Sequence, residues 1–239
     1  MALAGHAFLA LWNDIARARE PEYDRWHTLE HVPERVSVAG FHGSRRYVNR
    51  SRQDHRYFTL YEVASLATFE SAEYLDLLEH PTPWSASMRP DFSNFLRSIC
   101  SVVTTAGAGI GAAIAILRVP PETDAAALRS ALDDAAGMPN INAVHLGQTT
   151  TAAAAFAVPI DPPRPDCESL RPFDRIALIE ALDRDAASRA LAEVKRRLNL
   201  GALPADYGAD VYDLAFVFPG ADPGERLRHR RPAWDAGAR

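Results

Sequence analysis

The clearest alternation of hydrophobic and polar residues lies at 57–63, where Phe58 and Leu60 share one face of an expected strand. Apolar or alternating segments at 6–12, 41–48 and 99–105 predict three more strands in the same part of the chain. One helical pattern begins at Tyr23, between the expected strands at 6–12 and 41–48. A second covers 66–78, between those at 57–63 and 99–105. The first half therefore has the order βαββαβ.

The second half repeats this order with different side chains. Strands are expected at 112–119, 141–149, 175–182 and 211–218, and helices at 123–136 and 185–198. The glycine-rich segment 107–111 lacks the spacing of a nucleotide loop and is interpreted as a hinge. We therefore expect ferredoxin-like halves at 1–106 and 107–220 and a tail at 221–239.

A ferredoxin-like half has two helices on one face of a four-stranded antiparallel sheet, so its other face needs a partner. Stacking the open faces of the two halves gives an α+β barrel with helices outside. Pairing each half with a second chain is the alternative, and the hydrophobic pattern does not choose between them. Two interruptions are expected: Pro33 should kink the first helix or open a new one, and three prolines should make HPTPWSASMRPDF irregular.

Composition narrows the class of protein. The chain has 239 residues, 47% of them hydrophobic, which is ample for a packed core, and its net charge of -5 argues against nucleic acid as the main partner. The basic C-terminal residues are interpreted as a solvated tail. No apolar run approaches the ~20 residues of a membrane helix. Cys100 and Cys167 fit no metal spacing, and the N-terminus does not resemble a signal peptide, so we expect a reduced, cytoplasmic protein.

The candidate chemistry is concentrated in the segment YDRWHTLEHVPE, at 23–34. At about 100° per residue, an apolar stripe lies beside an ionisable arc that contains His27, Glu30 and His31. The order H-x-x-E-H is that of inverzincin metallopeptidases, but such an enzyme needs a further carboxylate ligand and a helix undisturbed by Pro33. Acid-base chemistry at His27 or His31, with Glu30 orienting the imidazole, is one interpretation. A solvated or inter-subunit polar face is the other.

A second candidate is the polar face of two adjacent expected strands. These strands offer a cation, hydroxyl groups and aromatic walls that suit a planar anionic or phenolic ligand; the residues are His42, Arg46, Tyr57, Thr59 and Tyr61. The alternative is that they fill an interface between sheets. Trp84 is expected either to form a lid over such a pocket or to anchor a surface loop.

The chain resembles the dimeric α+β barrel superfamily, and within it the EthD-like group, as a tandem fusion. The resemblance rests on the doubled βαββαβ order and on the segments WHTLEHVPERV, GFHGSRRY, YFTLYEV and HPTPWSASM. That superfamily includes cofactor-free monooxygenases, muconolactone-type isomerases, haem-binding proteins and stress-response barrels, so the fold assigns no reaction. A homodimer is implied by the resemblance, and no cofactor is expected.

The two halves differ where the candidate chemistry lies. The counterpart of the histidine helix is DAAALRSALDDAA, which has no histidine. We therefore expect one site, in residues 1–105. The leading hypothesis is a cofactor-independent enzyme that acts on a small aromatic or polyketide-like metabolite, with Arg46 stabilising an enolate or phenolate. A non-catalytic ligand-binding or assembly module is the alternative, and a metal- or haem-dependent oxidoreductase is a third. Against haem, His145 is the only histidine available in the second half before the tail, and its position on a strand is poor for a proximal ligand.

Overall fold

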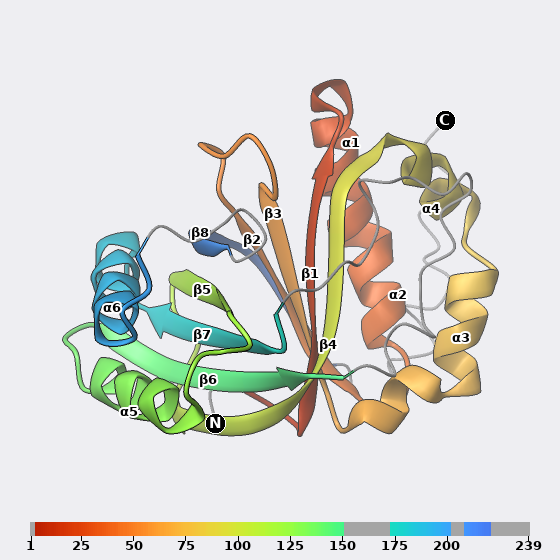
Figure 1. The fold of residues 1–239 in the computed structure, drawn as a ribbon. Coiled ribbons are helices and arrows are strands. Elements are labelled where there is room, and N and C mark those ends of the chain that lie inside the picture. Colours follow the sequence, from red (N-terminus) through yellow and green to blue (C-terminus); the bar gives the residue numbers. More distant parts are fainter. Residues whose placement is uncertain (1–2, 151–172, 202–207, 221–239) are drawn as a thin grey trace.

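Eight antiparallel strands form one closed barrel in the computed structural model, which describes residues 3–150, 173–201 and 208–220 (Figure 1). The strand order is β1-β3-β2-β8-β5-β7-β6-β4. Each half contributes four adjacent strands in the ferredoxin-like order, β4-β1-β3-β2 and β8-β5-β7-β6. The halves join where β2 pairs with β8 and β4 pairs with β6. The barrel therefore closes within one chain, and the predicted ferredoxin-like α+β barrel is confirmed.

The elements follow the predicted order with shifted ends. The strands are β1 (Ala7–Ile15), β2 (Phe41–Val48), β3 (Tyr57–Val63), β4 (Phe92–Gly107), β5 (Ala113–Val119), β6 (Ile141–Thr149), β7 (Arg175–Ala181) and β8 (Ala209–Pro219). The α-helices are α1 (Glu20–Trp26), α2 (Val32–Val36), α3 (Ala72–Glu79), α4 (Pro83–Met88), α5 (Ala125–Ala136) and α6 (Arg184–Arg197). Shorter turns are η1 (Arg17–Arg19), η2 (His27–His31), η3 (Leu66–Glu70) and η4 (Arg89–Asp91). The expected tail and the connection at 151–172 lie outside the described residues.

Strand β4 is much longer than the expected segment at 99–105. Its first part pairs with β1, from Phe92 opposite Ile15 to Ser101 opposite Ala7, and its last part pairs with β6. The hydrophobic pattern did not predict the first part of this strand, because the pattern is interrupted there by the polar residues Ser93, Asn94 and Arg97. Each of them lies in a polar or cavity-facing position. The long strand crosses from one half to the other and thereby closes the barrel.

The barrel interior contains an ionic cluster among aromatic and aliphatic side chains. Arg45 on β2 is 1% exposed, and its guanidinium donates to Glu62 on β3, at 2.8 Å from Nε, and to Glu180 on β7. Glu180 also accepts hydrogen bonds from the Gly111 amide, at 2.8 Å, and from Nε2 of His145, at 3.3 Å. Burial opposes ionisation, but His145 and Arg45 together hold the pKa of Glu180 below its usual value. The cluster thus joins side chains of both halves.

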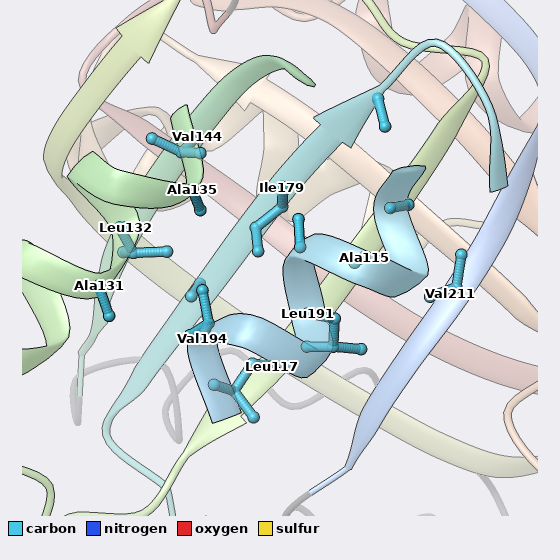
Figure 2. Close-up of a cluster of buried hydrophobic side chains, with 14 of the residues drawn as sticks. Ala115, Leu117, Ala131, Leu132, Ala135, Val144, Ile179, Leu191, Val194 and Val211 are labelled. Carbon is cyan, nitrogen blue, oxygen red and sulfur yellow. The ribbon is translucent and has the colours of Figure 1, made fainter. Parts of the chain in front are cut away.

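Helices α5 and α6 cover the outer face of the second-half sheet (Figure 1), and Figure 2 shows their side chains packed against strands of that sheet. Each helix begins at an aspartate, Asp124 or Asp183, whose carboxylate accepts a hydrogen bond from a backbone amide three residues later, at 2.7 Å. Small residues face the sheet on both helices, including Ala131, Ala135 and Ala190. The two layers can therefore approach closely.

Helices α1 to α4 cover the outer face of the first-half sheet (Figure 1). The expected interruption at Pro33 is present: the Val32 amide donates to the His27 carbonyl, five residues back, so 27–31 forms a π-helical turn before α2 begins. The expectation of an irregular segment after Pro81 is wrong, because α4 forms there. The Thr82 hydroxyl caps its first turn by accepting from the Ser85 amide, and Pro83 is tolerated at the first helical position.

Candidate functional site

A cavity lies between the first-half sheet and the helices that cover it. Strands β1, β3 and β4 form its floor, and the π-turn with the helices forms its walls; the lining residues are Leu9, Leu11, Asn13, Tyr23, Trp26, His27, His31, Arg35, Phe41, Thr59, Tyr61, Tyr74, Leu78, Ser85, Arg89, Phe92, Phe95 and Arg97. The cavity has about 70 Å³ of room for the centres of water molecules. At ~10–15 Å³ of such space per water, the cavity has room for about five to seven waters, and at ~30 Å³ of liquid volume each this corresponds to roughly one to two fused aromatic rings.

His27 is placed in this cavity by the π-turn and is 3% exposed. Its Nε2 lies 3.4 Å from the Thr59 hydroxyl, and its Nδ1 is buried without a hydrogen-bond partner among the described residues. Burial, then the charge of Arg46, then His31 lower the pKa of His27 well below 6.5. The imidazole is therefore neutral at pH 7. When Nε2 carries the proton and donates to Thr59, Nδ1 has a lone pair free to accept a proton.

His31 lines the cavity one π-turn later and stacks on Trp26, with ring centroids 4.4 Å apart. Its centroid is 5.5 Å from that of His27. Burial and the neighbouring charges of Arg35 and Arg89 lower the pKa of His31 well below 6.5, so this imidazole is also neutral at pH 7. Its Nδ1 has no hydrogen-bond partner in the part of the chain that the structure describes.

Tyr61 on β3 adds a third buried polar group to the lining. The side chain is 2% exposed, and its hydroxyl makes no hydrogen bond to any described residue. Burial raises the pKa of Tyr61 well above 10, so the phenol is protonated and can donate. A buried polar group without a partner costs about 1–3 kcal/mol. The hydroxyl and the two Nδ1 atoms thus form an unsatisfied set that a ligand in the cavity could satisfy.

The charged residues of the lining are all arginines: Arg35, Arg89 and Arg97. Arg97 on β4 donates to the Tyr74 hydroxyl at 3.0 Å, and Arg35 lies 3.2 Å from the carboxylate of Glu34. No aspartate or glutamate is among the described lining residues. The cavity therefore combines neutral histidines, aromatic rings and positive charge, a composition that favours an anionic or enolisable aromatic molecule over a cation.

Two of the residues expected to be catalytic lie outside the lining. The Glu30 carboxylate accepts hydrogen bonds from Thr82, at 2.6 Å, and Ser85, at 3.2 Å, so it is directed toward α4. Arg46 lies behind Tyr23, with its guanidinium 5.9 Å from that ring and 3.4 Å from Asp24. Arg46 can act on His27 through its charge, but these contacts direct it away from a ligand in the cavity.

The expected ligand-binding residues are divided in a similar way. Tyr61 lines the cavity, whereas Tyr57 packs against Tyr23, with centroids 4.7 Å apart, and burial raises its pKa to about 12. Trp84 donates to Glu22 at 3.2 Å, so it anchors α4 to α1 and contributes no lid to the lining. His42 is exposed, at the bulge where β2 pairs with β3. Only Tyr61 of these four lines the cavity.

The sequence interpretation missed the three lining arginines. Arg97 lies two residues from Phe95 and from Ile99 on β4, so the three side chains share one face of the strand. Extending the expected strand toward its N-terminus would have identified Arg97. Arg35 comes directly after the segment at 23–34 that was expected to carry the chemistry. Arg89 lies in η4, a turn within the proline-rich stretch, and the sequence pattern did not predict that turn. Arg89 reaches the cavity only through the path of α4, which is a tertiary feature.

The metal and haem alternatives find little support in the donor groups. The described residues contain no group of three or more His, Cys, Asp or Glu side chains placed to hold a metal ion. His145 lies inside the barrel, fully buried, with Nδ1 2.6 Å from the Thr105 hydroxyl and Nε2 at Glu180. Both ring nitrogens are therefore engaged, and the residue does not fit the role of a haem ligand.

Comparison with known proteins identifies the fold and leaves the family open. No family model matches the chain, and no curated protein matches its sequence. A candidate monooxygenase from Fusobacterium nucleatum has a similar structure, with a TM-score of 0.56 and 12% identity over 91% of this chain and 96% of the other. An anthrone oxidase-like protein has a TM-score of 0.55 and 11% identity, covering 91% and 94%. A candidate monooxygenase from Lactobacillus acidophilus has a TM-score of 0.50 and 12% identity, covering 90% and 97%.

At such low identity these similarities show the fold alone, a ferredoxin-like α+β barrel, and membership of the dimeric α+β barrel superfamily stays a prediction. The EthD-like assignment and the homodimer stay predictions. No helix in the described ranges has the length and apolar character needed to cross a membrane.

Proposed function

We propose that this protein is a cofactor-independent enzyme that removes a proton from a small aromatic molecule bound in the first-half cavity. The observation that carries this proposal is the neutral, buried His27, whose Nδ1 has no partner among the described residues and lies in the same cavity as the Tyr61 hydroxyl. A general base must be unprotonated and must have a free lone pair. His27 meets both conditions.

The proposed step breaks a C–H bond next to a carbonyl group and transfers the proton to Nδ1 of His27. The electron pair of that bond forms an enolate, which the Tyr61 hydroxyl stabilises by donating a hydrogen bond. A base with a low pKa is weak, so the substrate must be acidic at carbon, as a C–H group between an aromatic ring and a carbonyl is. Arg46 keeps the imidazole neutral before the step and favours release of the proton after it. The Thr59 hydroxyl can accept a hydrogen bond from Nε2, which is compatible with the tautomer that leaves Nδ1 unprotonated.

The similar structures add limited support for this chemistry. One is described as anthrone oxidase-like and two as candidate monooxygenases. Proton removal from an acidic carbon is a first step that oxygenation by molecular oxygen and isomerisation can share. Oxygen uptake measured with an electrode separates these two outcomes. The grouping with EthD-like proteins and the cytoplasmic location belong to the same proposal.

Exchange of the C1 protons of 2-tetralone for deuterium in D2O, followed by NMR, tests the proton transfer directly. This bicyclic ketone matches the size of the cavity, and its C1 lies between a ring and a carbonyl. We expect the wild type to accelerate exchange and His27→Gln to lose about 10²–10⁴-fold of that acceleration. His42→Gln is the matched control, because His42 is an exposed histidine outside the lining, and it should exchange at the wild-type rate.

The pH dependence supplies an independent check. Because the pKa of His27 is lowered well below 6.5, the unprotonated base persists as the pH falls from 8 past 6.5, and the exchange rate should decline only in more acidic solution. An inflection at or above pH 6.5 would contradict the assignment. Equal exchange by wild type and His27→Gln would contradict it too. Binding of 2-tetralone without any accelerated exchange would favour the alternative, a non-catalytic ligand-binding module.

A further inference from the structure

Two arginines meet at the last turn of α3, on the wall of the cavity. Arg35, from α2, donates to the Leu77 carbonyl at 3.5 Å, and Arg89, from η4, donates to the Leu78 carbonyl at 3.0 Å. The carbonyl groups at the C-terminal end of a helix carry partial negative charge, which attracts cations. The end of α3 therefore holds two guanidinium groups close together, beside Leu78 of the lining.

The positive charge of this pair is only partly balanced. Arg35 lies 3.2 Å from Glu34, whereas Arg89 has no carboxylate within 4.0 Å among the described residues. Burial and the charge of Arg35 lower the pKa of Arg89, and Glu34 offsets this only in part. Arg89 is half-buried, so it belongs to the outer part of the cavity and can be reached by a ligand.

The cavity continues from these arginines past His31 to His27. All four residues line the cavity, and the ring centroid of His31 lies 5.5 Å from that of His27, the proposed base. The charges of Arg35 and Arg89 lower the pKa of His31, which agrees with their lying near it. The rings of Trp26, Phe92 and Phe95 also line this space. The cavity therefore offers a cationic end, an aromatic wall and a basic end.

We infer that the natural substrate is an aromatic acid whose carboxylate binds Arg89, whose ring packs on the aromatic wall and whose acidic C–H group faces His27. This inference rests on the proposed function and names the substrate class of the same site. A guanidinium binds a carboxylate through two parallel hydrogen bonds, which fixes the orientation of a planar molecule as well as its position. The anion would supply the charge that Arg89 lacks.

The test compares 2-naphthoate with 2-naphthamide, two bicyclic molecules of nearly the same shape that differ in charge. Isothermal titration calorimetry measures the dissociation constant of each for the wild type and three variants. We expect the wild type to bind 2-naphthoate at least tenfold more tightly than the amide. Arg89→Gln, which keeps a donor for the Leu78 carbonyl, should abolish the preference while binding of the amide stays the same. Arg89→Lys should keep most of it, and Arg129→Gln, at an exposed arginine of α5, should keep all of it.

Equal affinity for the two probes in the wild type, or no binding of either, would overturn the inference. A tenfold preference that survives in Arg89→Gln would overturn it as well. Thermal melting shows whether each variant is folded, and Arg89→Lys provides the charge-conserving comparison. The proposed function fails separately: a preference for 2-naphthoate without His27-dependent exchange of 2-tetralone would keep the acid-binding site and remove the catalytic role.

Discussion

Replacing Arg45 with methionine tests the ionic cluster that joins the two halves of the barrel. Methionine has a similar length and no charge, so Arg45→Met removes the guanidinium and leaves Glu62 and Glu180 buried at 6% and 0% exposure. Loss of one member of a buried ion pair costs about 3–5 kcal/mol, because the remaining charge has no counterion. That cost is a large part of the ~5–15 kcal/mol that stabilises a typical domain.

The size of this loss should depend on pH. In the wild type, the lowered pKa of Glu180 contributes stability above the unfolded value, ~4.3, and that stability is lost as the pH falls through the folded value. Without Arg45, the hydrogen bonds from His145 and Gly111 still favour the carboxylate, but we expect burial to outweigh them and to raise the pKa of Glu180 above its unfolded value. The variant is then penalised increasingly as the pH rises. The difference in unfolding free energy should therefore be larger at pH 8 than at pH 5.

Urea denaturation of both proteins at pH 8 and pH 5, followed by circular dichroism, measures this difference. The double variant Arg45→Met/Glu180→Gln should regain part of the lost stability at pH 8, because one unpaired carboxylate has become a neutral amide. Arg129→Met, at an exposed position, should stay within about 0.5 kcal/mol of the wild type. A loss below about 1 kcal/mol at pH 8, or the same loss at both pH values, would refute this account of the cluster.

Two further substitutions test packing and the unsatisfied hydroxyl. A methyl group at Gly147 would overlap the buried ring of Phe8 and lie 3.0 Å from Cβ of Cys100, so Gly147→Ala should lower the unfolding free energy by about 1–3 kcal/mol. Gly201→Ala, where a Cβ meets nothing within 4 Å, is the control, and equal melting of the two would contradict the predicted overlap. Tyr61→Phe removes a hydroxyl without a described partner, so it should leave stability unchanged or raise it by up to about 1 kcal/mol while weakening 2-tetralone binding severalfold in calorimetry. Destabilisation by Tyr61→Phe would show that the hydroxyl has a partner in the folded protein.

The fold could be predicted wherever local pattern and tertiary role agree. Strand β3 alternates cleanly, and α5 and α6 each begin at an aspartate cap and present a regular small or apolar face. The pattern failed where tertiary contacts dominate. Strand β4 begins seven residues before the expected segment, because its polar side chains point into the cavity or toward β1 partners, and α4 depends on a threonine cap within a proline-rich stretch.

Part of the cavity lining could be predicted from the sequence, but the orientation of the residues expected to be catalytic could not. His27, His31 and Tyr61 are placed in one cavity, as the ionisable arc and the strand alternation suggested. An ideal helix also places Glu30 beside His31, but the π-turn widens the backbone at this point, and the carboxylate is directed to α4. The arginines of the lining come from β4, α2 and η4, and no local pattern brings these three segments together.

The two halves share their topology, so the difference between them must come from the helices. In the second half, the small alanines of α5 and α6 let the helices approach the sheet closely, and buried apolar side chains of both layers form one cluster (Figure 2). In the first half, a π-turn replaces regular helix, and α4 is held against it by Glu30 and by the Trp26 indole, which donates to Ser85 at 3.1 Å. Large aromatic and arginine side chains then separate the helices from the sheet. Within the described residues, the interrupted helix and the cavity thus occur in the same half, whereas the regular helices α5 and α6 pack directly on their sheet.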